Sequence, residues 1–390
     1  MDNQTKIVGV VGAGTMGSGI AQIAATFGHK VYLFDAFKNQ LKESEQDLVK
    51  ILQRQVAKDR ITQKEMDGIL KRIHFVDHLK NFPDCAIVFE AIIENLQAKQ
   101  DQFARLEGIV EKSCILATNT SSLSIASISS ALKKPERFLG VHFFNPVPVM
   151  NLVEIIPGIS TSGKIRDQVE SLVIDWEKVT VMARDTPGFI VNRVARPFYG
   201  EALRIYEEGM ANFTTIDWAM KELGGFKMGP FELMDLVGND VNYEVTETIF
   251  KQFYYDPRFK PSFVQKRLVE AGRLGRKTGH GFYDYGGEAK NPEPDKNEHL
   301  GNQILNRILA MLINEATDAV FMNVASVKDI DLAMKNGVNY PKGLLEWADE
   351  IGLDLVLNRM ESLREKYGED RYRPNPLLKR KVAKREQFYE

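Results

Sequence analysis

Residues 142–156, HFFNPVPVMNLVEII, form an apolar stretch that contains three polar side chains suited to chemistry. Histidine, with a reference pKa of ~6.5, can remove a proton from a hydroxyl group near neutral pH, so His142 is a candidate general base. Glu154 follows 12 residues later and could orient the imidazole and stabilise its charged form. Prolines break regular pairing between the two residues, so we expect an apolar loop that returns Glu154 to His142 and excludes water. A surface charge on an edge strand is the alternative for Glu154.

A glycine-rich turn near the start of the chain predicts dinucleotide binding. Gly12, Gly14 and Gly17 occur in GAGTMG, between a predicted strand and a predicted helix. Such glycines allow a tight turn, a close approach of the backbone to a pyrophosphate, and close packing of helix on strand. Asp35 ends the next strand, 21 residues after Gly14, where a carboxylate would bind the ribose of NAD and repel the 2'-phosphate of NADP. A generic tight turn with a solvated Asp35 is the alternative.

More polar groups follow three predicted strands, at 85–93, 114–119 and 137–144. They are Glu90, Glu94, Asn119, Thr120, Ser121, Ser122, His142 and Asn145. Because ligands bind outside the carboxyl ends of the strands in an open parallel sheet, we expect these groups at the same edge as the glycine turn. Taken singly, Asn and Ser are more often helix caps, and a lone histidine is more often a core residue. Their coincidence predicts a site in which Ser121, Asn145 and Asn192 donate hydrogen bonds to substrate or cofactor oxygens.

The elements that must position these groups divide the chain into parts. In the first part, strands alternate with helices, including a helical pair at 37–73, which predicts a mostly parallel sheet with helices on both faces. After DTPGF the pattern is helical, and no segment reads as a strand. The predicted segments are a sheet domain at 1–185, a helical domain at 186–285, a polar Pro/Gly-rich linker at 286–299 and a second helical domain at 300–390.

An internal repeat relates the two helical segments. Asn192-Arg193 recurs as Asn306-Arg307, and Glu201-Ala202 recurs as Glu315-Ala316, each 114 residues apart. The same offset relates Asp217 to Asp331, Ala219-Met220 to Ala333-Met334, Gly229 to Gly343, Asp235 to Asp349, and Gly238 to Gly352. These matches without a gap indicate a duplication. The motif RLGRKTGHGFYDY, which closes the first copy, has no full counterpart in the second.

Composition narrows the classes of partner. The 390 residues include 51 Lys and Arg against 53 Asp and Glu, which gives no electrostatic reason to expect nucleic acid or a membrane surface as a partner. Cys85 and Cys114 both lie in apolar runs of sequence. We therefore expect both to be buried free thiols in a protein of a reducing compartment. The histidines and cysteines lack metal-ligand spacing, so we expect no metal. The chain shows no secretory signal and no membrane-spanning run, and we expect a cytoplasmic protein.

Several motifs together resemble the L-3-hydroxyacyl-CoA dehydrogenase family. They are GAGTMGSGIA, Asp35, EAIIEN, TNTSSLSI, GVHFFNPVPVMNLVEII, DTPGFIVNRV and RKTGHGFYDY, in this order. The resemblance covers residues 5 to about 285, and 300–390 is similar to a second copy of the family's helical domain. Such tandem chains occur among 3-hydroxyadipyl-CoA dehydrogenases of phenylacetate catabolism and multifunctional enzymes of fatty-acid β-oxidation. The resemblance implies a Rossmann-type α/β domain followed by two all-α domains like the C-terminal domain of 6-phosphogluconate dehydrogenase.

The resemblance also implies roles for individual residues. His142 would be the catalytic base and Glu154 its partner. Ser121 would contact the substrate's 3-oxygen near the nicotinamide, and Asn192 would position the substrate. The residues that would bind NAD are Gly12, Gly14, Met16, Gly17, Asp35, Ile92, Ile93, Glu94, Lys99, Ser121 and Asn145. Lys58, in the basic stretch QRQVAKDR, would contact a phosphate of CoA.

The activity implied by the resemblance is the NAD-dependent oxidation of L-3-hydroxyacyl-CoA to 3-oxoacyl-CoA. The acyl chain would be short, as in 3-hydroxybutyryl-CoA, or dicarboxylic, as in 3-hydroxyadipyl-CoA. The alternatives are an enzyme that oxidises a free hydroxy acid such as gulonate, and a non-catalytic NAD-binding protein. Because single-copy members of the family pair through the helical domain, we expect 300–390 to pack on 186–285 as an internal pseudo-dimer. The protein could then be a monomer, or it could form a further homodimer.

Overall fold

The computed structural model describes residues 5–287 and 290–389, and the chain forms two compact units, Met1–Thr186 and Pro187–Glu390. Residues 288–289 of the predicted linker, and the outermost residues of the first and last predicted segments, lie outside the described residues. The first unit holds a sheet, and the second is helical apart from isolated bridges near residues 275–284. No helix within the described ranges combines the length and the apolar character that crossing a membrane requires.

The first unit is built on an eight-stranded sheet. Its strands are β1 (Ile7–Val11), β2 (Lys30–Phe34), β3 (Ile73–Val76), β4 (Ile87–Glu90), β5 (Ile115–Thr118), β6 (Phe138–Phe143), β7 (Leu152–Pro157) and β8 (Val179–Met182). Their order is β3-β2-β1-β4-β5-β6-β7-β8, and only the β6–β7 pair is antiparallel. This confirms the mostly parallel sheet. The strand β3 was not expected, because four residues directly after a helix are too few to show an alternating pattern.

Helices cover both faces of this sheet, as predicted. They are α1 (Thr15–Thr26), α2 (Lys38–Val56), α3 (Gln63–Arg72), α4 (Leu96–Glu107), α5 (Ile125–Ser129) and α6 (Gly163–Asp175). Helices α1, α2, α3 and α6 share one hydrophobic core with alternate strand residues such as Leu139 and Val141 of β6. On the other face, Phe103 of α4 packs edge-on against Phe138, and Ile125 of α5 lies against Gly140. Odd and even positions of β6 therefore face different helices.

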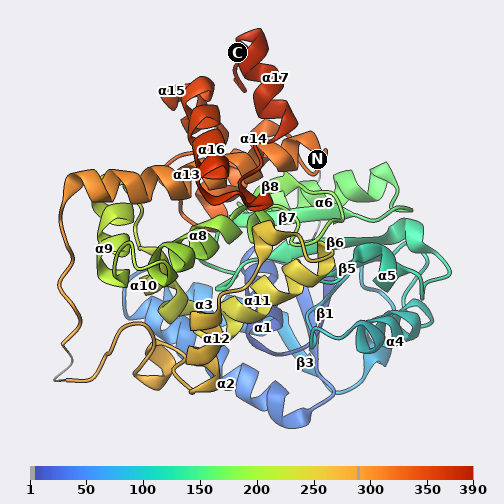
Figure 1. Ribbon diagram of the computed structural model, residues 1–390. Coiled ribbons are helices and arrows are strands. Elements are labelled where there is room, and N and C mark those ends of the chain that lie inside the picture. The colour runs from blue at the N-terminus through green and yellow to red at the C-terminus, as the bar shows by residue number, and fades with distance from the viewer. Residues whose placement is uncertain (1–4, 288–289, 390) are drawn as a thin grey trace. The chain divides into compact units, whose positions relative to one another are not determined.

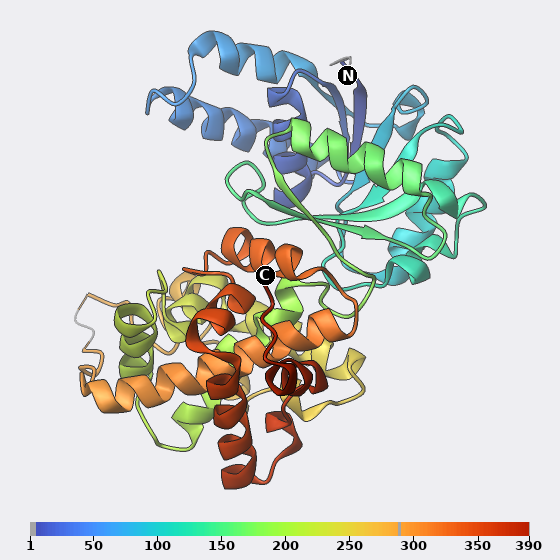
Figure 2. The same cartoon turned by 90° about the horizontal axis from the view of Figure 1, so that it is seen from above.

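The second unit contains the remaining helices. They are α7 (Val191–Val194), α8 (Arg196–Glu207), α9 (Phe213–Trp218) with the π-helical turn η3 (Ala219–Leu223), α10 (Pro230–Val237), α11 (Asn239–Gln252), α12 (Phe263–Glu270), α13 (Glu298–Phe321), α14 (Val327–Gly337), α15 (Leu344–Ile351), α16 (Leu353–Tyr367) and α17 (Pro376–Lys384). The long helix α13 runs beside α8 and η3 (Figure 1). Helix α16 packs across α13 from another side (Figure 2). Helix α13 therefore forms the centre of the second unit.

The two helical segments repeat the same local device. Asp217 accepts hydrogen bonds from two backbone N–H groups at the start of α10, at 2.9 Å each, and Asp331 does the same at the start of α15. A Cβ atom on Gly229 would lie 2.3 Å from the Asp217 carboxyl, and one on Gly343 would lie 2.4 Å from that of Asp331. The glycines recur because each lets a buried aspartate approach a helix start.

The last described residues supply a partial counterpart of the motif that closes the first copy. The backbone N–H groups of Phe282-Tyr283 bond to Asp235 at 3.0 and 2.9 Å, and those of Phe388-Tyr389 bond to Asp349 at 2.9 Å each. Each tyrosine hydroxyl then donates to the aspartate that caps α10 or α15, at 2.8 and 2.9 Å. These pairs lie 106 residues apart, so they are invisible at the offset of 114 that relates the other matches.

The two copies exchange ion pairs reciprocally. Arg193 Nε lies 2.7 Å from Glu315 Oε1, and Arg307 Nε lies 2.6 Å from Glu201 Oε1. At the offset of 114 residues, Arg193 corresponds to Arg307 and Glu201 corresponds to Glu315. Each copy's arginine therefore bonds to the glutamate of the other copy. An exchange of equivalent contacts is characteristic of two-fold pairing.

Candidate active site

A buried histidine–glutamate pair connects β6 and β7. His142 lies directly opposite Glu154 in the antiparallel register, and such opposite residues project from the same face of a sheet. His142 Nδ1 is 2.7 Å from Glu154 Oε2, and the two side chains are 8% and 0% exposed. Because an ionised carboxylate can only accept a hydrogen bond, it favours a proton on Nδ1 and leaves Nε2 as the basic nitrogen. Strand β7 lies inside the sheet, which excludes the reading of Glu154 as an edge-strand surface charge.

Other polar side chains share this face of the sheet with His142. Glu90 ends β4 and Thr118 ends β5, and the Thr118 hydroxyl donates to Glu90 Oε2 at 2.6 Å. The ammonium group of Lys99, on α4, donates to Glu90 Oε1 at 2.6 Å and is only 1% exposed. A buried carboxylate requires such pairing and hydrogen bonding. The structure thus places Lys99 in a buried polar row on the α4–α5 face.

Glu94 holds the serine-rich loop that follows β5. Its Oε1 atom accepts hydrogen bonds from the backbone N–H groups of Ser121 and Ser122 at 2.9 Å each, and from the Thr120 hydroxyl at 2.6 Å. Burial opposes the ionisation of Glu94, but the Lys99 ammonium at 3.4 Å and these hydrogen bonds outweigh it and lower the pKa of Glu94. Glu94 is therefore ionised at neutral pH and fixes the backbone at Ser121.

Short connections order the remaining strand ends. Ile92 and Ile93 lie between β4 and α4, where the Ile92 N–H donates to Glu90 Oε1 at 2.7 Å and the Ile93 side chain is exposed. Asn119 Oδ1 accepts a hydrogen bond from the Phe143 N–H at 2.8 Å. The end of β5 is thereby fastened to the end of β6, beside the histidine–glutamate pair.

The glycine turn has the shape that a dinucleotide requires. Gly12 has φ +102, and a Cβ atom there would lie 2.4 Å from the Ala91 carbonyl oxygen; a Cβ atom on Gly17 would lie 1.8 Å from the Gly12 carbonyl oxygen. At Gly14, by contrast, a Cβ atom would meet nothing within 4 Å, so the backbone is open to a ligand. Gly14 caps α1 without a side-chain hydrogen bond, and Met16 packs against the core. The start of α1 can therefore receive a pyrophosphate.

Asp35 braces this turn from the end of β2. Its Oδ2 atom accepts a hydrogen bond from the Ala13 N–H at 2.8 Å, and its Oδ1 atom accepts one from the Phe37 N–H at 2.9 Å. Each carboxylate oxygen retains a second lone pair that can accept a bond from a ribose hydroxyl. The bracing role was not predicted, because it depends on the pairing of β1 with β2 and not on the sequence near Asp35.

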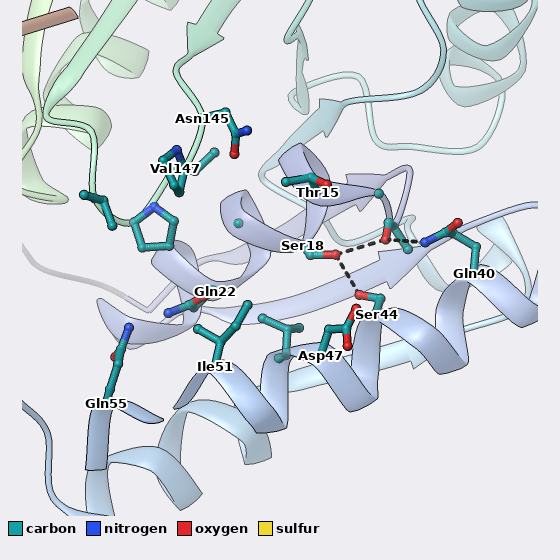
Figure 3. Close-up of a pocket in the computed structure, with 17 residues that line it drawn as sticks. Thr15, Ser18, Gln22, Gln40, Ser44, Asp47, Ile51, Gln55, Asn145 and Val147 are labelled. Atoms are coloured by element: carbon teal, nitrogen blue, oxygen red, sulfur yellow. Dashed lines mark hydrogen bonds between the residues drawn. The ribbon is translucent and has the colours of Figure 1, made fainter. Parts of the chain in front are cut away.

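A pocket of the first unit opens beside the glycine turn (Figure 3). It is lined by the start of α1, one side of α2 and the loop after β6, with the residues Ala13, Gly14, Thr15, Ser18, Gly19, Gln22, Gln40, Ser44, Asp47, Leu48, Ile51, Gln55, Asn145, Pro146, Val147, Pro148 and Val149. The Ser18 hydroxyl lies 2.7 Å from that of Ser44 and donates to the Ala13 carbonyl at 3.0 Å, which ties α2 to the turn. The pocket thus brings the predicted residues Gly14 and Asn145 around one hollow.

Lys178, which was not predicted, fixes the loop that carries Asn145. Its Nζ atom donates to the carbonyl oxygens of Val147 and Met150 at 2.7 Å each. Burial lowers the pKa of Lys178 to about 8. On the opposite side, Gly19 of α1 leaves room for Val147, since a Cβ atom there would lie 2.8 Å from Val147 Cβ. In the sequence, a single lysine before a strand cannot be distinguished from a solvated one.

Two predicted residues belong to other elements of the chain. Lys58 is exposed in the turn that follows α2, and it does not line the pocket. Asn192 belongs to the second unit, where it is half-buried in α7.

Known protein families match both units. Residues 7–186 match the model of the 3-hydroxyacyl-CoA dehydrogenase NAD-binding domain. The model of the C-terminal domain of 3-hydroxyacyl-CoA dehydrogenase matches twice, at 188–285 and 304–387. The predicted tandem copy of the helical domain is thus confirmed.

Relatives and solved structures agree with these matches. The chain is 36% identical to 3-hydroxyadipyl-CoA dehydrogenase of Escherichia coli K12, with 97% of each chain covered. It is 41% identical to human mitochondrial hydroxyacyl-coenzyme A dehydrogenase, with 72% of this chain and 91% of that protein covered. The crystal structure of 3-hydroxybutyryl-CoA dehydrogenase from E. coli K12 superposes with a TM-score of 0.93 at 35% identity, with 97% of this chain and 98% of that chain covered. The chain therefore belongs to the 3-hydroxyacyl-CoA dehydrogenase family, and its first unit is the NAD-binding domain of that family.

Proposed function

We propose that the protein catalyses the NAD-dependent oxidation of L-3-hydroxyacyl-CoA to 3-oxoacyl-CoA. The observation that carries this proposal is the buried His142–Glu154 pair, joined at 2.7 Å in the same sheet as the glycine turn. Family membership supplies the CoA ester as the substrate class. The relatives named 3-hydroxyadipyl-CoA and 3-hydroxybutyryl-CoA dehydrogenase favour a dicarboxylic or a short acyl chain.

His142 acts as the general base of the proposed mechanism. Its Nε2 atom takes the proton of the substrate's 3-hydroxyl group while a hydride leaves carbon 3. NAD, when bound, supplies the acceptor for that hydride. Glu154 on Nδ1 holds the ring in position and stabilises the imidazolium that forms. Ser121 donates a hydrogen bond to the 3-oxygen, and Asn192 positions the substrate.

For the cofactor, we propose that Gly12, Gly14 and Gly17 receive the pyrophosphate and that Asp35 binds the adenosine ribose. The predicted contact set also includes Met16, Ile92, Ile93, Glu94, Lys99, Ser121 and Asn145. Glu94 and Lys99 act by holding the Ser121 loop, because the Lys99 ammonium is buried between Glu90 and Glu94. Lys58 remains our candidate for a CoA phosphate contact, which its exposed position in the turn after α2 would permit.

The first experiment is to measure NADH oxidation with acetoacetyl-CoA beside free acetoacetate. We expect rapid oxidation with the CoA ester only, and a panel of longer and dicarboxylic esters would then rank the acyl chains. Equal rates with the free acid would favour the free-hydroxy-acid alternative. No oxidation with either compound, in a protein that binds NADH, would favour the non-catalytic alternative. If NADP serves as well as NAD, the role of Asp35 is wrong.

The histidine has its own test. His142→Ala should lower kcat by ~10²-fold or more, the usual worth of a positioned general base. Glu154→Gln keeps the size of the side chain and should lower kcat less, since the base is retained. Near-normal turnover of His142→Ala would refute its role.

We also propose domain boundaries and an assembly. The ranges 1–185, 186–285, 286–299 and 300–390 serve as sheet domain, first helical domain, linker and second helical domain, and the two helical domains form an internal pseudo-dimer. The reciprocal Arg–Glu pairs support this arrangement. Truncation after residue 290 should leave an aggregating or inactive protein, because it uncovers α8; a soluble, fully active product of unchanged stability would refute the pseudo-dimer. A cytoplasmic location stays a prediction.

A further inference from the structure

The helix that carries Asn192 is a weak element on its own. Helix α7 is a single turn, Val191–Val194, and it follows two residues with positive φ, Gly188 at +72 and Phe189 at +46. A phenylalanine in this backbone region is uncommon and persists only where its surroundings hold it. One isolated helical turn does not maintain its own shape in water. The position of Asn192 therefore depends on what holds α7 from outside.

Arg193, the next residue, connects α7 to the second copy. Its guanidinium is 2% exposed; Nε lies 2.7 Å from Glu315 Oε1, and Nη2 lies 2.6 Å from Asp318 Oδ2. Both carboxylates belong to α13. Arg258 Nη1 bonds to the same two carboxylates at 2.9 and 3.0 Å, which completes a closed cluster. Helix α7 also packs against α13 and α14 of the second copy, while within the first copy it adjoins α8 and the Arg193 guanidinium lies over the Phe253 ring. The second copy therefore supplies the buried carboxylates that hold α7.

The mirror cluster lacks a comparable site beside it. Arg307 bonds to Glu201 at 2.6 Å and to Glu208 at 2.7 Å. Its neighbour Asn306 lies within the unbroken helix α13, and among the residues that the structure describes no second histidine–glutamate pair accompanies it. The chain therefore contains the same arginine–carboxylate cluster twice. One cluster adjoins Asn192, a predicted site residue, and the other adjoins Asn306, which is not one.

We infer that Glu315 is a positioning residue for the reaction: through Arg193 it holds α7, and with it the amide of Asn192. This inference rests on the proposed function, in which Asn192 positions the substrate. Glu315 itself touches neither substrate nor cofactor in this scheme. The second copy thus contributes to catalysis through one buried carboxylate, in addition to covering the first copy.

Glu315→Gln is the first test variant. It keeps the size of the side chain but turns an N–H₂ donor toward Arg193 or Arg258, which can only donate. We expect kcat/KM to fall by ~10- to 100-fold, the cost of a catalytic group displaced by about 1 Å. Glu201→Gln makes the same change in the mirror cluster and should leave kcat/KM within about twofold. Equal losses of activity in the two variants would overturn the inference, because they would reflect general destabilisation.

A double-mutant cycle separates positioning from a structural role. If Glu315 acts through Asn192, adding Glu315→Gln to Asn192→Ala costs little further activity, whereas independent effects add. Additive losses would overturn the inference. If Glu315→Gln has wild-type kinetics while Asn192→Ala is impaired, the inference about Glu315 is overturned and the proposed function stands. If Asn192→Ala itself has wild-type kinetics, the proposed role of Asn192 in positioning the substrate is refuted. If Glu315→Gln does not fold, Asp318→Asn alters the same Arg193 contact at a carboxyl that is 16% exposed.

Discussion

The two helical copies share a framework and differ where the chain enters them. In the second copy, α13 runs unbroken over Glu298–Phe321, which at the 114-residue offset corresponds to 184–207. In the first copy the same stretch contains the turn at Gly188 and Phe189, the short helix α7 and then α8, which ends at 207. In the first copy the break places Asn192 in a separate short helix, α7. The entry turn therefore distinguishes the copies, while the bundle behind it is retained.

What the copies retain is a set of matched polar contacts. The reciprocal arginine–glutamate pairs, the capping aspartates of α10 and α15, and the two Phe-Tyr segments all recur. The surface pair Lys221–Glu232 at 2.6 Å likewise recurs as Lys335–Glu346 at 3.5 Å. Variants of these contacts can therefore show whether equivalent contacts in the two copies contribute equally to the free energy of unfolding.

The largest effect should come from the reciprocal pairs. Arg193→Met and Arg307→Met should each lower the free energy of unfolding of the second unit by about 3–5 kcal/mol, because each removes an arginine partner from a buried glutamate. Denaturant unfolding measures this loss. Arg373→Met, which breaks an exposed pair with Asp370 at 3.0 Å, is the control and should change it by less than about 1 kcal/mol. A large loss of unfolding free energy in only one of the two arginine variants would show that the two ion-pair clusters do not contribute equally to stability.

The pH dependence of stability should differ between the capping aspartates. Burial, opposed by three hydrogen-bond donors, raises the pKa of Asp217 from 3.8 to about 7. Between these values the unfolded chain binds fewer protons than the folded one, so the free energy of unfolding falls as pH rises from about 4 to 7, by up to about 4 kcal/mol. Asp217→Asn should remove this slope. Asp331→Asn should remove less, because nearby Lys335 lowers the pKa of Asp331 against the effect of burial, whereas nearby Glu232 raises that of Asp217. Denaturant unfolding at several pH values between about 4 and 7 measures this slope. A free energy of unfolding that rises over this range would show that the hydrogen bonds to Asp217 outweigh the effect of its burial.

Activity should separate the two asparagines. Asn192→Ala should lower kcat/KM by ~10²-fold, the typical cost when a substrate is displaced by about 1 Å from its reactive position. Asn306→Ala should leave steady-state kinetics unchanged, because α13 presents it to no predicted site. A loss of activity in Asn306→Ala would mean that the second copy has a site of its own.

The smallest effect should come from the tyrosine hydroxyls. Tyr283→Phe removes a 2.8 Å bond to Asp217 and should cost about 1–2 kcal/mol, and Tyr389→Phe should cost less because Tyr389 is 38% exposed. Thermal unfolding of both variants measures the difference. Equal losses would imply that exposure does not weaken the second contact.

Much of the first unit was predictable because its signals are local. The glycine turn and the buried strands are visible in short windows of sequence. The repeat of the second unit was predictable for another reason, its constant offset of 114 residues. The pairing of His142 with Glu154 was predicted from residue types, whereas its cause, the antiparallel register of β6 and β7, appears only in the fold.

The remaining features depend on contacts between distant segments. Lys99 reads as a surface lysine on a helix, yet its ammonium lies between Glu90 and Glu94. Lys178 donates hydrogen bonds to a loop about 30 residues earlier in the chain. The Phe388 N–H bonds to Asp349 as the Phe282 N–H bonds to Asp235, but these two phenylalanines are 106 and not 114 residues apart. No local pattern encodes these contacts, because each depends on where another element packs.

The peptide connection between the copies has a further consequence for their pairing. Two separate chains that associate through such a face fall apart on dilution, because their association depends on concentration. Here the second copy is joined to the first by a short polar segment, so it is present at a fixed effective concentration, on the order of millimolar for a short linker. The reciprocal contacts of Arg193 and Arg307 should thus persist at any protein concentration, and the specific activity should not change on dilution.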